Sequence, residues 1–161
     1  MIHKLNKKEN KIQLNYIFDI LYQQLKKSKN KKEVPVSALV FDPKSKKIIS
    51  KSYNKNKLEN NPCMHAEIDS IIRACKKLKV SRLDGMDIYC TLEPCLMCSS
   101  VIFQSKIRRV YFAIEDKKNG ALLNNYKLGF KENINHRIDM YYGFKEQKFS
   151  KVIKNFFKNK R

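Results

Sequence analysis

Two short motifs, far apart in the chain, constrain its fold more than any other feature. The first is His65-Ala66-Glu67 and the second is Pro94-Cys95-Leu96-Met97-Cys98. One imidazole and two thiolates can hold a zinc ion, and three protein ligands leave the fourth tetrahedral position open to water, as in catalytic rather than structural sites. The fold therefore has to bring the histidine and the cysteine pair to one point.

Both motifs are predicted to lie at the starts of helices. Pro94 suits a first helical turn, because that position needs no backbone donor. Cys95 and Cys98, spaced i and i+3, would then share a helical face and chelate one ion, and the positive end of the helix dipole favours their thiolate forms. Glu67 lies about 200° around an ideal helix from His65, so the two side chains would point to nearly opposite sides. Glu67 is therefore better placed to carry protons than to act as a further metal ligand.

A Cys-x-x-Cys pair alone is also found in structural zinc sites and in redox pairs. The chain has five cysteines, and an odd count argues against a disulfide framework. Cys63, Cys75 and Cys90 are predicted to be buried or incidental thiols, although Cys63 is close enough to His65 to line the same pocket. The order H-x-E and then P-C-x-x-C is the signature of zinc nucleobase deaminases, and the two motifs resemble it.

Length and composition predict one compact domain in the cytoplasm. The 161 residues are 42% hydrophobic, enough for a single substantial core and too apolar for global disorder. The first residues lack the apolar stretch of a signal peptide, and no apolar run is long enough for a membrane span. We therefore expect no membrane association.

The charge balance is strongly basic. Thirty-five lysines and arginines against fifteen acidic residues give a net charge of +20, which favours a polyanionic partner such as nucleic acid. Of the 35, 29 are lysine, and the chain is also rich in asparagine, as a general compositional bias would produce. RNA binding and a merely solvated surface are both consistent with this charge.

The first part of the chain is predicted to form a helix followed by a β-hairpin. Apolar residues at helical spacing predict an amphipathic helix over 14–25, ending in the polar run 26–32. Segments 34–41 and 48–53 are predicted to be antiparallel strands joined by a turn at Asp42-Pro43. A loop then leads to the metal histidine.

The second part alternates helix and strand. A helix follows His65, strands are predicted at 86–91, 110–114 and 138–142, and a basic helix over 145–161. Alternation of strand and helix favours parallel pairing in this part. We therefore expect an α/β protein with a mixed sheet and helices on its faces.

Further segments carry a family resemblance over nearly the whole chain. They are Glu33-Val34-Pro35-Val36, Asn61-Pro62, Thr91-Leu92-Glu93, Ser105-Lys106-Ile107-Arg108-Arg109-Val110, Asp116 with Lys118 and Gly120, Asn135-His136-Arg137, and Phe156-Phe157-Lys158. With the zinc motifs, they resemble the bacterial tRNA adenosine deaminases of the cytidine deaminase-like superfamily. The match is weak between residues 121 and 131.

This resemblance implies a three-layer α/β/α cytidine deaminase-like fold, with a mixed five-stranded sheet flanked by helices. It also implies one zinc-dependent deaminase domain over residues 1–161, ending in a basic helix, and a homodimer. The implied activity is hydrolytic conversion of adenosine to inosine at the wobble position of a tRNA anticodon, in an arginine tRNA. The implied partner is the anticodon stem-loop, whose unpaired bases can be splayed out at little cost.

Residue roles follow from the same resemblance. His65, Cys95 and Cys98 would bind one zinc ion per subunit, which makes a hydroxide available at neutral pH. Glu67 would take the proton from the water and deliver protons to N1 and to the departing amino group of adenine.

Five further residues would contact the substrate. Asn54 would hydrogen-bond the target nucleotide, and Ala66 would offer its backbone N–H to the base. Asp116 and Asn135 resemble loop positions that contact the anticodon, although both also suit turns without a ligand. The pair Phe156-Phe157 resembles a C-terminal element that lies near the RNA in relatives, and core packing is the alternative role for one of the two rings.

Glu93 precedes a proline that pushes it toward an extended conformation, which favours a structural role over catalysis.

Two other functions remain open at this point. One is deamination of a free nucleobase or nucleoside of the guanine or cytosine type, which uses the same zinc chemistry and fold. The other is a non-catalytic RNA-binding or regulatory subunit that keeps zinc as a fold element. The presence of Glu67 argues against the second, because an inactive relative would be expected to lose the carboxylate that moves protons.

Overall fold

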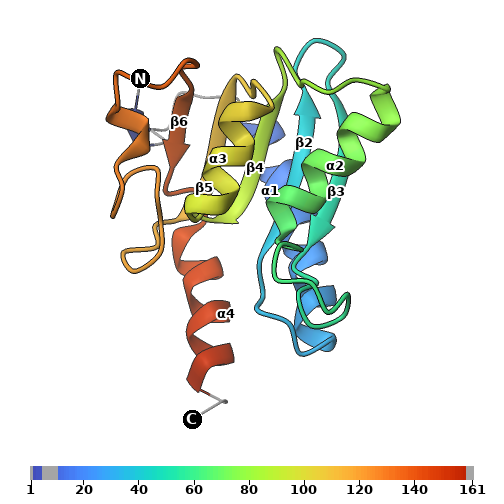
Figure 1. Cartoon of the computed structure of the whole chain (residues 1–161). Helices are drawn as coiled ribbons and strands as arrows, with labels where there is room; N and C mark the ends of the chain where they lie inside the picture. Colours follow the sequence, from blue (N-terminus) through green and yellow to red (C-terminus); the bar gives the residue numbers. More distant parts are fainter. Residues whose placement is uncertain (1, 5–10, 159–161) are drawn as a thin grey trace.

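The protein folds around one mixed β-sheet (Figure 1). The computed structural model describes residues 2–4 and 11–158 of the chain. The strand order across the sheet is β1-β6-β5-β4-β2-β3. The strands are β1 (Ile2–Lys4), β2 (Ser37–Asp42), β3 (Lys47–Tyr53), β4 (Asp87–Leu92), β5 (Arg109–Ile114) and β6 (Asp139–Tyr142).

The pairing of the strands confirms the expected mixed sheet. Strand β2 runs antiparallel to both β3 and β4, whereas β4, β5 and β6 are parallel to one another. Strands β2 to β6 are the five that the sequence predicts. The short strand β1 extends the sheet by pairing in parallel with β6, an addition that three residues carry too little pattern to predict.

Four helices cover the two faces of the sheet. They are α1 (Lys11–Asn30), α2 (Ala66–Leu78), α3 (Leu96–Gln104) and α4 (Glu146–Lys158), and a short 3-10 turn, η1, spans Leu128–Phe130. Helices α2 and α3 lie in front of the sheet in Figure 1, while α1 lies behind it. Helices α1 and α4 share one apolar cluster, so they cover the same face. This arrangement confirms the three-layer α/β/α fold.

Alternating side chains of the central strands build the two cores. In β2, Ala38 and Val40 pack with α2 and α3, whereas Leu39 and Phe41 pack with α1 and α4. Successive side chains of a strand point to opposite faces, and both faces are covered here. The strands therefore read as continuous apolar runs. The sheet interior is a rigid base for the loops at its ends.

Helix α1 ends within the polar run, as the sequence predicts. It spans Lys11–Asn30, and Lys32 then adopts a left-handed conformation with φ 58°. Lysine is a good helix former, and Ser28 keeps one face of this last part of the helix buried by donating its hydroxyl to the Leu25 carbonyl. The polar run is therefore largely helical.

Smaller differences concern element ends. Strand β2 begins at Ser37 rather than residue 34, because Pro35 has no N–H for the ladder. Helix α3 begins at Leu96, so Pro94 precedes the helix instead of opening it. The predicted C-terminal helix is confirmed as α4 up to Lys158, and its last residues, 159–161, lie outside the described residues.

In the part of the chain that the structure describes, no helix has the length and apolar character to cross a bilayer.

Candidate active site and metal centre

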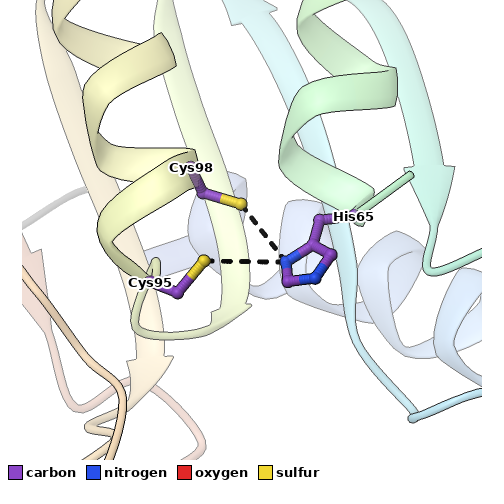
Figure 2. A group of neighbouring side chains, drawn as sticks. All are labelled: His65, Cys95 and Cys98. Atoms are coloured by element: carbon purple, nitrogen blue, oxygen red, sulfur yellow. Dashed lines mark hydrogen bonds between the residues drawn. The ribbon is translucent and has the colours of Figure 1, made fainter. Parts of the chain in front are cut away.

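The two sequence motifs meet where helices α2 and α3 begin (Figure 2). His65 is the N-cap residue of α2, and Cys95 is the N-cap residue of α3, each with an extended backbone. Neither side chain caps its own helix. An N-cap side chain usually accepts a hydrogen bond from one of the first free backbone N–H groups of its helix. Here both side chains turn toward each other instead, which leaves an imidazole and a thiol available for a ligand.

The three ligand atoms have the spacing of a tetrahedral metal site. His65 Nδ1 lies 3.7 Å from Cys95 Sγ and 3.4 Å from Cys98 Sγ, and all three atoms lie within 4.8 Å of one another (Figure 2). Zinc bonds of about 2.0–2.3 Å in tetrahedral geometry place neighbouring ligand atoms about 3.4–3.8 Å apart. The distances from His65 Nδ1 to the two cysteine sulfurs therefore fit a zinc ion.

The cysteine pair shares one proton when no metal is bound. The thiol of Cys98 and the imidazole of His65 both hydrogen-bond Cys95, and the bond from Cys98 has the larger effect, so the pKa of Cys95 falls to about 4. The neighbouring Cys95, together with burial, raises the pKa of Cys98. One thiolate thus exists well below neutral pH. A cation bound between the two sulfurs would favour the second thiolate as well.

Glu67 lies beside this centre in a buried position. Its side chain is on the first turn of α2, with 3% of the residue exposed, and its Oε2 accepts a hydrogen bond from Cys98 Sγ at 3.6 Å. Burial raises the pKa of Glu67 to about 6. A carboxyl group with that pKa can both accept and donate a proton near neutral pH. The expected position of Glu67, next to the ligands but not one of them, agrees with this geometry.

Asn54 and Ala66 border the same site. Ala66, the first residue of α2, is fully buried next to His65. The side-chain N–H₂ of Asn54 donates to Glu33 Oε2 at 3.2 Å, which fixes the orientation of its amide. The predicted contacts of Asn54 and Ala66 with a nucleotide stay predictions.

Glu33 holds the loop that leads to the metal histidine, a role that sequence reasoning missed. Its Oε1 accepts the backbone N–H groups of Lys57 and Leu58, at 2.7 and 2.8 Å, and the residue is 1% exposed. Buried backbone N–H groups need acceptors, and this carboxylate supplies them. The family match at Glu33 was the only signal, because its partners are distant in sequence.

A buried ion pair ties the same loop to α2. Lys55 Nζ and Ser52 Oγ both donate to Asp69 Oδ2, and the side chains of Lys55 and Asp69 are 9% and 7% exposed. Arg73 adds a further contact to Asp69 at 2.9 Å. Burial opposes ionisation of Asp69, but the hydrogen bonds from Lys55, Ser52 and Arg73 outweigh it and lower its pKa. The ion pair fixes Lys55 against α2, the helix that carries Glu67. No periodic pattern in the sequence indicates the pairing of Lys55 with Asp69.

Glu93 organises the loop on the other side of the centre. Its carboxylate accepts the backbone N–H groups of Asp116 and Leu123, at 3.0 and 2.8 Å, and also bonds Asn124. A Cβ atom added at Gly120 would overlap this carboxylate, which explains a glycine there. The predicted structural role of Glu93 agrees with these contacts.

The remaining predicted contact residues lie on three separate segments. Asp116 caps its own turn, accepting the N–H groups of Lys118 and Asn119 at 3.0 Å each. Asn135 is exposed ahead of β6. Phe156 is a buried residue of α4 whose ring packs edge-to-face on the exposed Phe157. The chain beyond β5 supplies none of the three metal ligands, and contact of these residues with RNA stays a prediction.

Comparison with known proteins places these features in a known group. The sequence profile of the MafB19-like deaminases matches residues 12–161. The tRNA-specific adenosine deaminase of Rickettsia bellii is 39% identical over 132 residues, which cover 82% of this chain and 91% of that protein. The tRNA-specific adenosine deaminase of Aquifex aeolicus is 35% identical, covering 91% of this chain and 95% of that protein.

A solved structure agrees with the sequence relatives. It comes from a study of A-to-I editing by tRNA:A34 deaminases at the wobble position of transfer RNA. It superimposes on this chain with a TM-score of 0.82 at 30% identity, and covers 86% of this chain and 99% of its own. Fold and sequence thus point to the same relatives.

Removing one ligand should weaken metal binding. We expect the purified chain to contain about one zinc ion, and Cys98→Ala to lower zinc affinity by at least about tenfold, because two ligands cannot complete a tetrahedral site. Cys75→Ala is the matched control, since Cys75 lies outside the ligand group. Elemental analysis of both variants after dialysis is the measurement; equal zinc in both would contradict the assignment.

Acid should weaken the fold through Asp69. Its folded pKa lies below the unfolded value of 3.8, so its ion pair stabilises the protein above that pH and is lost as pH falls through the folded pKa. Asp69→Asn should cost about 3 kcal/mol of unfolding free energy at pH 7, because Lys55 is left buried and unpaired.

The measurement is urea unfolding of wild type and Asp69→Asn between pH 7 and pH 3. The difference between them should narrow only toward the acid end. The control is Asp84→Asn, which removes an exposed ion pair with Arg82 and should leave the free energy of unfolding close to that of wild type. A difference between wild type and Asp69→Asn that is constant with pH would refute the role given to the Asp69 carboxylate.

Proposed function

The chain belongs to the tRNA-specific adenosine deaminase family, and we propose that it hydrolyses adenosine to inosine at the wobble position of a tRNA anticodon. The observation that carries this proposal is the buried carboxyl of Glu67 beside the His65, Cys95 and Cys98 ligand set. A non-catalytic relative would need the ligands but not this carboxyl group. The Rickettsia bellii and Aquifex aeolicus relatives are both tRNA-specific adenosine deaminases, so they do not favour deamination of free guanine or cytosine bases.

The proposal assigns zinc to the three ligand residues. When bound there, the ion lowers the pKa of a coordinated water toward about 7 and so supplies a nucleophile at neutral pH. The raised pKa of Cys98 makes its thiolate unfavourable without a cation. With zinc bound, the two negative thiolates of Cys95 and Cys98 would balance the charge of the ion. Water is the co-substrate, and ammonia and inosine are the products.

Glu67 moves the protons. Its carboxylate accepts a proton from the attacking water at Oε1 or Oε2 and delivers it to N1 of the adenine ring. Glu67 then takes the second proton of the added water from the oxygen now bonded to C6 and delivers it to the amino group, which leaves as ammonia while the C6 oxygen becomes the carbonyl of inosine. Burial, which raises the pKa of Glu67 to about 6, makes the carboxyl basic enough for the first transfer and acidic enough for the second.

Asn54 and Ala66 position the base. The Asn54 amide is held by Glu33, so its carbonyl oxygen and remaining N–H keep a fixed direction for a nucleotide. Ala66 has no side chain beyond Cβ, and its N–H belongs to the free first turn of α2. Asp116, Asn135 and Phe156 would contact the anticodon loop around the target.

The proposal includes an arginine tRNA as substrate, a homodimer, action in the cytoplasm and one catalytic domain over residues 1–161. The basic surface would bind the phosphates of the anticodon stem. Helix α4 extends beyond the sheet on the side where α2 and α3 begin (Figure 1). Its exposed Lys151, Lys154 and Lys158 face solvent there, so they are candidates for phosphate contacts.

Glu67→Ala should separate binding from chemistry. We expect this variant to keep zinc and tRNA binding and to lose deamination by at least about a hundredfold, because proton transfer typically contributes that much or more. The measurement is inosine formed in an anticodon stem-loop, with zinc content and RNA affinity determined alongside. Glu59→Ala, an exposed glutamate of the preceding loop, is the control. Full activity in Glu67→Ala would overturn the mechanism.

The alternative activity is tested in the same assay. Wild-type protein should form inosine in the stem-loop and release no ammonia from free guanine, cytosine or their nucleosides. Turnover of the free compounds alone would replace the proposed function by the nucleobase deaminase.

Salt should weaken RNA binding steeply. Each neutralised phosphate releases counterions, so the logarithm of affinity falls linearly with the logarithm of salt concentration. Lys151→Glu with Lys154→Glu should lower this slope. Lys76→Glu with Lys77→Glu is the control, because these residues lie at the end of α2 away from His65. Filter binding from 50 to 300 mM salt, on the order of physiological ionic strength, measures the slopes. A flat wild-type response would rule out the basic surface as the binding face.

A further inference from the structure

A hollow of about 250 Å³ lies on the α1 side of the sheet, at the end opposite to the metal centre. Residues where β4 and β5 begin line it, whereas Cys95 follows the end of β4. The six residues of β4 separate the two ends of the sheet by roughly 20 Å. The start of α1 and the turn between β2 and β3 complete the walls. The hollow is therefore a place apart from the deaminase site.

The aromatic floor of the hollow offers no open ring face. Phe41, Tyr89 and Tyr111 are 3%, 4% and 5% exposed. Tyr111 is stacked between Tyr89 and Tyr141 of the neighbouring strands, with ring centroids 4.3 and 4.7 Å apart. A nucleobase needs a free ring face to stack on. The floor therefore does not suit a base.

The rim of the hollow is positively charged. Lys46, Arg108 and Arg109 line it together with one carboxylate, Asp87, among the described residues. Asp139 lies near Arg109, but its Oδ2 is 3.6 Å from Nε, which is too far for a hydrogen bond. The three cations therefore outnumber the nearby carboxylates, and the balance favours an anionic ligand.

Arg108 is fixed in place and still has donors to offer. Its Nε and one terminal nitrogen donate to the two oxygens of Asp87, at 3.0 and 2.9 Å. The Asp87 side chain is buried, whereas that of Arg108 is 40% exposed. A guanidinium group has five N–H donors, so several remain for a second acceptor. Its planar fork can hold a carboxylate on one edge and a phosphate on another.

The other two cations also stand on ordered structure. The Arg109 guanidinium lies over the Tyr141 ring, 5.7 Å from its centroid. Lys46 is exposed on the turn that Asp42 organises by accepting the backbone N–H of Lys44 at 2.9 Å. Donors that are held in place before a ligand arrives lower the entropy cost of binding.

We propose that this hollow binds a phosphate group, with Lys46, Arg108 and Arg109 as its donors. Phosphate oxygens accept charge-assisted hydrogen bonds from both kinds of cation, and no ring face is needed. The phosphate belongs either to a free phosphorylated compound or to an RNA backbone at a distance from the edited base. The inference goes beyond the proposed function, because it concerns a second site.

Binding of inorganic phosphate to the zinc-loaded protein tests the site. The variant Lys46→Gln with Arg109→Gln removes two cations and leaves the pair of Arg108 with Asp87 intact. The control, Lys76→Gln with Lys77→Gln, removes the same charge at the end of α2, outside the hollow. Isothermal titration calorimetry gives the dissociation constants, and thermal unfolding and zinc content check the folding of each variant.

Wild type and control should bind phosphate with a Kd on the order of 1 mM. The double variant should bind at least about tenfold more weakly, because each lost charged hydrogen bond changes the Kd by about that factor. Lys46→Gln alone, at an exposed position, should weaken binding severalfold, and it provides the test if the double variant does not fold.

Two results would overturn the inference. One is the absence of saturable phosphate binding to wild type. The other is an equal Kd in wild type and in the variants of the hollow, as phosphate at the metal centre or diffusely held among the surface lysines would give.

Two further ligands identify the source of the phosphate. They are glycerol phosphate, a small monoester without a base, and a full-length tRNA, whose backbone can reach a distant site. Weaker binding of glycerol phosphate alone to the double variant assigns the hollow to a free compound. A loss of tRNA affinity beyond that of the control assigns it to the RNA backbone. Inosine formation does not enter these measurements, so failure of the proposed function would leave them unchanged.

Discussion

The candidate active site depends on keeping two helix starts at a fixed separation, because His65 directly precedes α2, whereas Cys95 directly precedes α3 and Cys98 lies in the first turn of α3. Neither N-cap side chain caps its own helix, since His65 and Cys95 face each other. Two buried carboxylates hold the neighbouring loops in place. Glu33 accepts backbone N–H groups of the loop ahead of His65, and Glu93 those of the loop beside Cys95. The same device, a buried acceptor for orphan amides, thus braces the site on both sides.

Two carboxylates on the first turn of α2 show how neighbours set opposite roles. Glu67 is buried, and this desolvation raises its pKa to about 6. Asp69, two positions later, receives hydrogen bonds from Lys55, Ser52 and Arg73, and its pKa is lowered. The first group is therefore suited to move protons, whereas the second is a permanent anion that fixes the loop.

The sequence predicts the parts of this molecule that are local or periodic. Alternating and continuous apolar runs place strands β2 to β6, and the two motifs predict the meeting of His65, Cys95 and Cys98, a group that could hold a metal ion. Contacts between distant residues lie beyond such reasoning. The bonds of Glu33 to Lys57 and Leu58 and the pairing of Lys55 with Asp69 each need the tertiary arrangement.

The burial of several acidic side chains changes the charge of the protein surface. Glu33, Glu67, Asp69, Asp87 and Glu93 are all buried, out of only fifteen acidic residues in the chain. Few anions are left to interrupt the lysines outside, so the surface behaves as a polycation whose like charges repel. Dissolved ions then act on the molecule in two opposite directions. They relieve the repulsion and favour the compact state, while they compete with a polyanion for the same lysines. A bound nucleic acid would itself serve as the counterion that this surface lacks.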